Sequence, residues 1–169
     1  TPRRNAKTPT WRTKEEDSTM KLSKNLSLAE VTKSNTANRL GIDNTPDEWE
    51  VENLKAIAEE VFQPLRDTFK TPIYVSSGYR SKELNVAIGG STRSQHIQGR
   101  ALDLDADVFG GCTNGEIFRW ILNNLAFDQL IWEFGDSDNP DWVHVSYVRD
   151  GLNRKRCLKA CRDDQGKTY

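Results

Sequence analysis

The chain has 169 residues, which is enough for one domain with a buried core. Hydrophobic residues make up 36% and charged residues 29% of it, which is polar for a globular protein but excludes a disordered chain. The net charge of -1 excludes a broad electrostatic attraction to nucleic acid or to a membrane surface. There is also no run of about 18 apolar residues that could span a bilayer. We therefore expect neither nucleic acid nor membrane among the partners.

The two ends of the chain differ in pattern from its middle. Residues 1–19 are polar and lack periodicity, and we expect a flexible N-terminal extension there. An ordered domain is expected over residues 20–149. Residues 150–169 are polar again and are expected to form a loosely packed tail with a short helix near Leu158. The three cysteines, at positions 112, 157 and 161, are too few to form a disulfide framework, and an odd number cannot all pair. We therefore expect structural or incidental roles for them.

The first half of the expected domain has the signals of helices. Ser27 and Glu30 have the spacing of a capping box and predict a short helix start. A second short helix is expected over residues 34–40, where Gly41 would end it.

The clearest helix begins near residue 45. Thr45 is the expected N-cap, Pro46 suits the first turn and Glu48 completes the capping box. Apolar residues then recur at helical spacing and predict one buried face: Leu54, Ile57, Ala58, Val61, Phe62, Leu65 and Phe69. Pro64 lies inside this pattern and predicts a kink or break.

The second half of the domain alternates short strands with short helices. The expected strands cover residues 73–75, 101–105, 129–134 and 142–147, and the expected helices cover residues 81–87 and 113–125. Because the helices come first and most strands come later, the pattern predicts an α+β fold.

The only two histidines lie in segments that also hold acidic residues. His96 precedes Asp103 by seven residues, and Gly99 allows a tight turn between them. His144 lies on the expected strand at 142–147, three residues after Asp141. Two histidines and one carboxylate form a catalytic zinc set that leaves the fourth position open for water. The alternative is that both histidines are incidental surface or structural residues.

A catalytic zinc site also needs a general base and a group that binds the substrate. Asp141 is the best placed acid for the base, and Glu133, on the neighbouring expected strand, is the second candidate. Arg80 follows a glycine-containing turn and could present its guanidinium to a substrate carboxylate.

Together these segments resemble the zinc D-Ala-D-Ala carboxypeptidase family. The resemblance covers roughly residues 22–148 and depends on five motifs. These are Ser-Gly-Tyr-Arg-Ser at 77–81, Leu-Asn at 84–85, Gly-Gly at 89–90, Ser-x-His-x-x-Gly-x-Ala-x-Asp at 94–103, and Trp-Val-His at 142–144. The family includes bacterial carboxypeptidases, D-Ala-D-Ala dipeptidases and phage L-alanyl-D-glutamate endolysins, and the Hedgehog signalling domain shares its fold.

The resemblance implies zinc held by His96, Asp103 and His144, with Asp141 as acid/base and Arg80 contacting the substrate. Ser94 would line the site. Many family members have a glutamate where this chain has Asp141, at the same spacing from the last histidine. The implied fold is α+β, with helices packed on a small antiparallel sheet.

The expected function is that of a monomeric zinc metallopeptidase that hydrolyses peptide bonds in peptidoglycan stem peptides. Either a carboxypeptidase or an endolysin-type endopeptidase agrees with the motifs. A non-catalytic, zinc-stabilised binding module of the same fold is the alternative. No basic-then-apolar signal peptide is visible. We therefore expect synthesis in the cytoplasm and action in the cell wall or periplasm, as in phage lysis, or secretion after removal of a leader.

Overall fold

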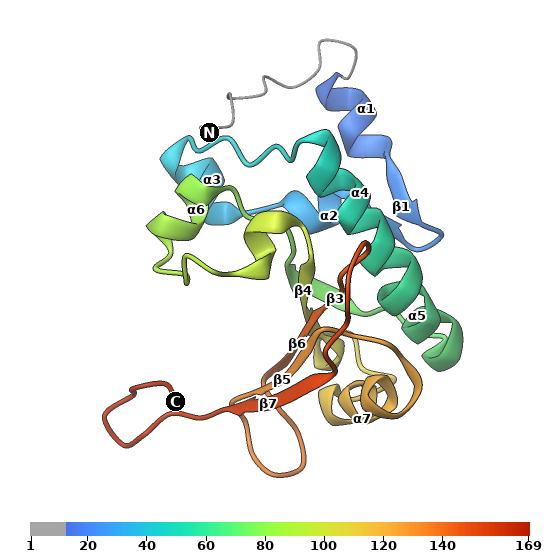
Figure 1. Ribbon diagram of the computed structural model, residues 1–169, viewed down its shortest axis with the longest axis vertical. Helices are drawn as coiled ribbons and strands as arrows, with labels where there is room; N and C mark the ends of the chain where they lie inside the picture. The colour runs from blue at the N-terminus through green and yellow to red at the C-terminus, as the bar shows by residue number, and fades with distance from the viewer. Residues whose placement is uncertain (1–12) are drawn as a thin grey trace.

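A five-stranded sheet forms the centre of the computed structural model, which describes residues 13–169 (Figure 1). In spatial order its strands are β3 (Tyr74–Ser77), β4 (Ala101–Asp105), β6 (Trp142–Ser146), β5 (Gln129–Glu133) and β7 (Arg156–Ala160). The pairs from β3 to β5 are antiparallel, and β7 runs parallel to β5. The mixture of this sheet with short helices is the α+β fold that the sequence predicts. Residues 1–12 of the expected N-terminal extension lie outside the described residues.

One face of the sheet packs against helices and forms the core. Leu102 and Leu104 of β4 and Val143 and Val145 of β6 are fully buried in this cluster. The helices are α4 (Glu48–Ile57), α5 (Gln63–Phe69) and α7 (Asn114–Asn124), which lie to the right of the sheet in Figure 1. Because side chains alternate along a strand, Asp103 and His144 must project from the opposite face.

The N-terminal part adds small elements beside this core. They are α1 (Lys14–Thr19), β1 (Lys21–Ser23), β2 (Leu26–Ser27), α2 (Leu28–Thr32) and α3 (Asn35–Leu40). The capping box of Ser27 with Glu30 is present as predicted, and Gly41 ends α3 in the left-handed conformation. The described part of the expected extension is not irregular, because Thr13 caps α1.

The start of α4 differs from the prediction by two residues. Asp47, not Thr45, is the N-cap, and its capping box is formed with Glu50. The Thr45 N–H instead bonds to the Asp43 side chain, at 3.0 Å, in the turn that leads into the helix. The predicted break near Pro64 takes the form of a π-helical turn, η1 (Ala58–Phe62), before α5.

The C-terminal region contains a strand where the sequence predicts a loose tail with a short helix. Residues 156–160 form β7 and pair with the whole of β5, from Gln129 with Arg156 to Glu133 with Ala160. The helix prediction is wrong because the edge of β5 supplies backbone partners that no local pattern reveals. None of the described helices is long and apolar enough to cross a membrane.

Candidate metal centre

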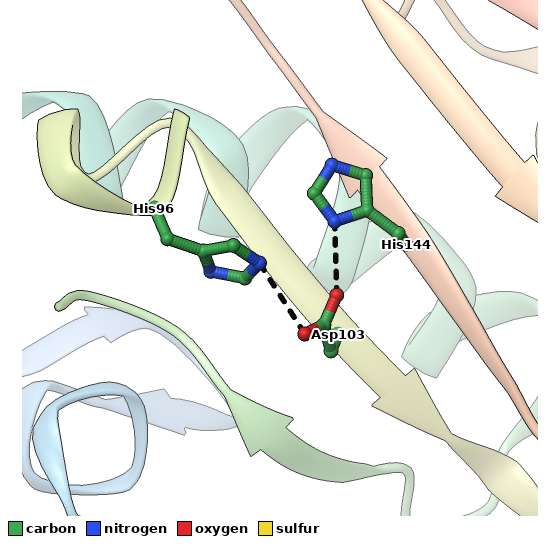
Figure 2. Close-up of side chains that lie close together, drawn as sticks. All are labelled: His96, Asp103 and His144. Atoms are coloured by element: carbon green, nitrogen blue, oxygen red, sulfur yellow. Dashed lines mark hydrogen bonds and ion pairs between the residues drawn. The ribbon is translucent and has the colours of Figure 1, made fainter. Parts of the chain in front are cut away.

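Three side chains from separate elements converge on the face of the sheet that lies opposite the helix-packed core (Figure 2). Asp103 on β4 pairs in register with His144 on β6, and His96 lies on a 3₁₀ turn, η2 (Gln95–Gln98). His144 Nδ1 is 2.9 Å from one carboxylate oxygen of Asp103, and His96 Nε2 is 3.3 Å from the other. One potential ligand atom from each residue lies within 4.8 Å of the other two. The structure thus brings the three predicted ligands together.

The turn that carries His96 is fixed by its two ends. Ser94 caps η2, and its side-chain oxygen accepts a hydrogen bond from the His96 N–H at 3.3 Å. Gly99 ends the turn with a φ of +68°, where a Cβ would lie 2.6 Å from the Glu50 carbonyl oxygen. Only glycine fits there, as the tight turn predicted from sequence requires.

A hydrogen bond to the backbone fixes the ring of His96. Its Nδ1 lies 2.6 Å from the carbonyl oxygen of Gly78, which can only accept, so Nδ1 carries the proton. Nε2 therefore presents a lone pair toward the Asp103 carboxylate, and it is buried without a hydrogen-bond partner among the described residues. A cation between these two electron-rich atoms would relieve their repulsion, so the donor set fits a divalent metal such as zinc.

The electrostatics of the cluster agree with this fit. Burial lowers the pKa of His96 and favours the neutral, metal-binding form, although Asp103 opposes the shift. Burial acts to raise the pKa of Asp103, but its interactions with the two histidines outweigh burial and hold that pKa well below its usual value. A neutral imidazole beside an ionised carboxylate is the protonation state that a metal site needs.

Arg80 lies close to this cluster, just after β3. Its backbone N–H donates to the His96 carbonyl oxygen at 3.1 Å, and its guanidinium donates to Asn85 at 3.2 Å. Burial lowers the pKa of Arg80, while Asp103 acts in the opposite direction. Its Nε atom is buried without a hydrogen-bond partner within the described part of the chain. Arg80 is therefore a half-buried cation with unused capacity to donate hydrogen bonds.

The two predicted acids occupy different environments. Glu133 is half-buried at the end of β5. Burial and Asp103 raise its pKa, whereas His144 and Arg162 act to lower it. Asp141 is exposed just before β6, and its N–H donates to the Glu133 carbonyl oxygen at 2.9 Å. Within residues 13–169, no hydrogen bond or ion pair joins the Asp141 carboxylate to the three clustered residues.

Sequence reasoning missed a network beside the site. The buried carboxylate of Asp128, just before β5, accepts hydrogen bonds from Gln95 at 2.9 Å and from the Arg154 guanidinium at 2.9 and 2.8 Å. Gln95 precedes His96, so this network ties the turn η2 to the segment that leads into β7. No motif marks Asp128, because its partners come from distant parts of the chain. Gly78 was part of a recognised motif, but its contact with His96 depends on tertiary structure.

Comparison with known proteins agrees with this geometry. The zinc D-Ala-D-Ala carboxypeptidase of Streptomyces albus G is 33% identical to this chain over 75 residues. That match covers 44% of this chain and 28% of the carboxypeptidase. A model of the family described as Peptidase M15 matches residues 24–146, which include all three clustered residues. This match spans most of the chain, and the chain therefore belongs to the peptidase M15 family.

Proposed function

We propose that this chain is a zinc-dependent peptidase that hydrolyses a peptide bond in peptidoglycan stem peptides. The juxtaposition of His96, Asp103 and His144 is the observation that carries the proposal. Membership of the peptidase M15 family supports hydrolysis of a peptide bond. The name of the Streptomyces albus G relative supports zinc and a D-Ala-containing peptide substrate.

Bound zinc would polarise the scissile carbonyl and acidify a water molecule. Asp141 takes a proton from the attacking water as the water oxygen bonds to the carbonyl carbon, and it delivers that proton to the leaving amine as the C–N bond breaks. Arg80 binds a carboxylate of the substrate and thereby orients the peptide, because its half-buried guanidinium borders a surface groove and forms no ion pair within residues 13–169. Ser94 acts indirectly by capping the turn that carries His96.

Glu133 is the second candidate for the proton transfer. It lies on the strand that pairs with β6, and its pKa responds to both His144 and Asp103. A raised pKa suits a group that must exchange protons near neutrality. Asp141 has the spacing to His144 that family members use, but its carboxylate is exposed. The two carboxylates therefore need separate tests.

The metal assignment is tested by exchanging His144 for alanine. We expect the His144→Ala variant to lose both stoichiometric zinc, measured by elemental analysis, and cleavage of purified muropeptides. Asn124→Ala, at the exposed end of α7, is the matched control and should keep both. Unchanged cleavage by His144→Ala would refute the proposal. Stoichiometric zinc in the wild type without turnover of any muropeptide would favour the non-catalytic binding module.

The base is identified by comparing Asp141→Asn with Glu133→Gln. Both changes keep the shape of the side chain and remove its charge, so zinc content should stay unchanged. If Asp141 is the base, kcat falls by about 100-fold or more in Asp141→Asn only. A larger loss in Glu133→Gln would transfer the role to Glu133.

The peptide bond that the enzyme cleaves can be identified from the products of muropeptide digestion. We propose a single-chain, monomeric enzyme that acts in the cell wall, where its substrate occurs. Mass spectrometry of digested muropeptides distinguishes release of a terminal D-Ala from cleavage within the stem. Loss of a single D-Ala would identify a carboxypeptidase, and cleavage between L-Ala and D-Glu would identify an endolysin-type endopeptidase.

A further inference from the structure

A groove runs beside the metal centre along the edge of the sheet. It has a volume of about 440 Å³ and lies between α3, β3 and the short helix α6 (Lys82–Ala87). Lys33 and Ser34 line one side, Tyr74 and Ser77 of β3 line the other, and Arg80 also borders the groove. Because β3 is an edge strand, nothing in the five-stranded sheet covers this side of it.

The charge of the groove is opposite in sign to that of the whole chain. Its described lining contains two cations, Lys33 and Arg80, and no aspartate or glutamate, whereas the chain has a net charge of -1. Within residues 13–169, neither cation forms an ion pair with a carboxylate. The Lys33 ammonium lies 4.1 Å from the centroid of the Tyr74 ring, a cation–π contact that holds it at the groove. The groove is thus built for an anionic, hydrogen-bonding ligand.

The groove is continuous with the metal centre through residues 77–80. Ser77 pairs with Asp103 across β3 and β4, and the Gly78 carbonyl oxygen holds the His96 ring. Arg80 borders the groove and also interacts electrostatically with Asp103 and His96. A peptide that contacts Arg80 at the site can therefore extend along β3 toward Lys33.

We propose that this groove is a second carboxylate subsite, in which Lys33 binds an acidic group of the same peptide that Arg80 orients. This inference rests on the proposed function. A D-Glu residue linked through one carboxyl keeps its other carboxyl, and the C-terminus of the peptide supplies a second; each can be prepared as the free acid or as the amide. Lys33 makes the enzyme select the free acid at one of these positions, because a neutral amide gains no ion pair with the ammonium.

The test uses a stem pentapeptide with both carboxyls free and two versions, each amidated at one carboxyl. Binding to the zinc-loaded full chain is measured by fluorescence anisotropy, and mass spectrometry checks that the peptides stay intact. Where they are cleaved, kcat/KM replaces affinity. Because Arg80 and Lys33 each bind one carboxylate, we expect the wild type to prefer the free acid at both positions. The preference that depends on Lys33 should be about 5-fold, a typical magnitude for a solvent-accessible ion pair. The preference should shrink as salt increases.

Three variants isolate the role of Lys33. Lys33→Met should lose the preference at one of the two positions only, keep it at the position that Arg80 binds, and keep the affinity for the corresponding amide. Lys33→Arg should retain both preferences. Lys24→Met removes the same charge from the exposed turn between β1 and β2 and should behave as the wild type. Equal losses in Lys33→Met and Lys24→Met, or unchanged preferences at both positions in Lys33→Met, would overturn the subsite. Absence of cleavage by the wild type would contradict the proposed function, whereas the binding preference would still test the groove.

Discussion

Replacing Asp128, whose carboxylate is buried, tests whether the C-terminal strand is an integral part of the domain. Its hydrogen bonds with Arg154 are the main cause that lowers its pKa from 3.8 to about 2. The Arg154 N–H also donates to this carboxylate, at 3.2 Å, so the contact fixes the backbone that leads into β7. Asp128→Asn keeps the shape of the side chain but removes its charge.

The size of the effect follows from the pKa. A shift of this size corresponds to about 2 kcal/mol, because one pKa unit is worth about 1.4 kcal/mol. The Arg154 side chain is 50% exposed, so solvent screening reduces the expected loss to about 1–2 kcal/mol. A depressed pKa stabilises the fold above the unfolded-state value. The contribution of Asp128 should therefore be complete at pH 7 and disappear as the pH falls from 3.8 toward about 2.

The assay is urea unfolding of the metal-free chain at pH 7 and at several lower pH values. The matched control is Asp150→Asn, whose carboxylate also pairs with an arginine, at 2.9 Å from Arg100, but is 51% exposed. That control should lose less than about 0.5 kcal/mol. Equal stability of Asp128→Asn and wild type at pH 7 would refute the reasoning, as would a difference that persists undiminished at pH 2.

Three further predictions concern the turn, the metal and a cap. Gly99→Ala should destabilise the chain by about 2–4 kcal/mol in urea unfolding, from left-handed strain plus the close approach to Glu50. Gly89→Ala, with a similar φ of +72° and open space around the Cβ, should lose only about 1 kcal/mol; equal losses would contradict the steric argument. Zinc at 100 times its Kd should stabilise the metal-free chain by about 2.7 kcal/mol and raise its Tm in calorimetry, but not that of His144→Ala; equal shifts would place the metal elsewhere. Ser27→Ala should cost about 1 kcal/mol in urea unfolding with unchanged zinc content, and loss of zinc would mean that this cap also supports the site.

Local chemistry explains why much of the secondary structure could be predicted. The cap at Ser27 and the left-handed end at Gly41 depend on residues within one or two turns of each other. The strand at residues 101–105 was predicted with its exact bounds, because its alternation of apolar and acidic residues reflects one buried and one open face. The cap of α4 was misassigned because Thr45 and Asp47 are both good N-caps.

The sequence by itself determined which residues were candidates for the metal. The chain has only two histidines, and both lie in recognisable motifs, so His96, Asp103 and His144 could be named without a structure. Only the tertiary structure brought them together, since their convergence depends on the register of β4 with β6 and on the Gly78 carbonyl oxygen that orients His96. Strand pairing and such long-range contacts join residues far apart in the chain. Local patterns carry no information about them, which is also why β7 escaped prediction.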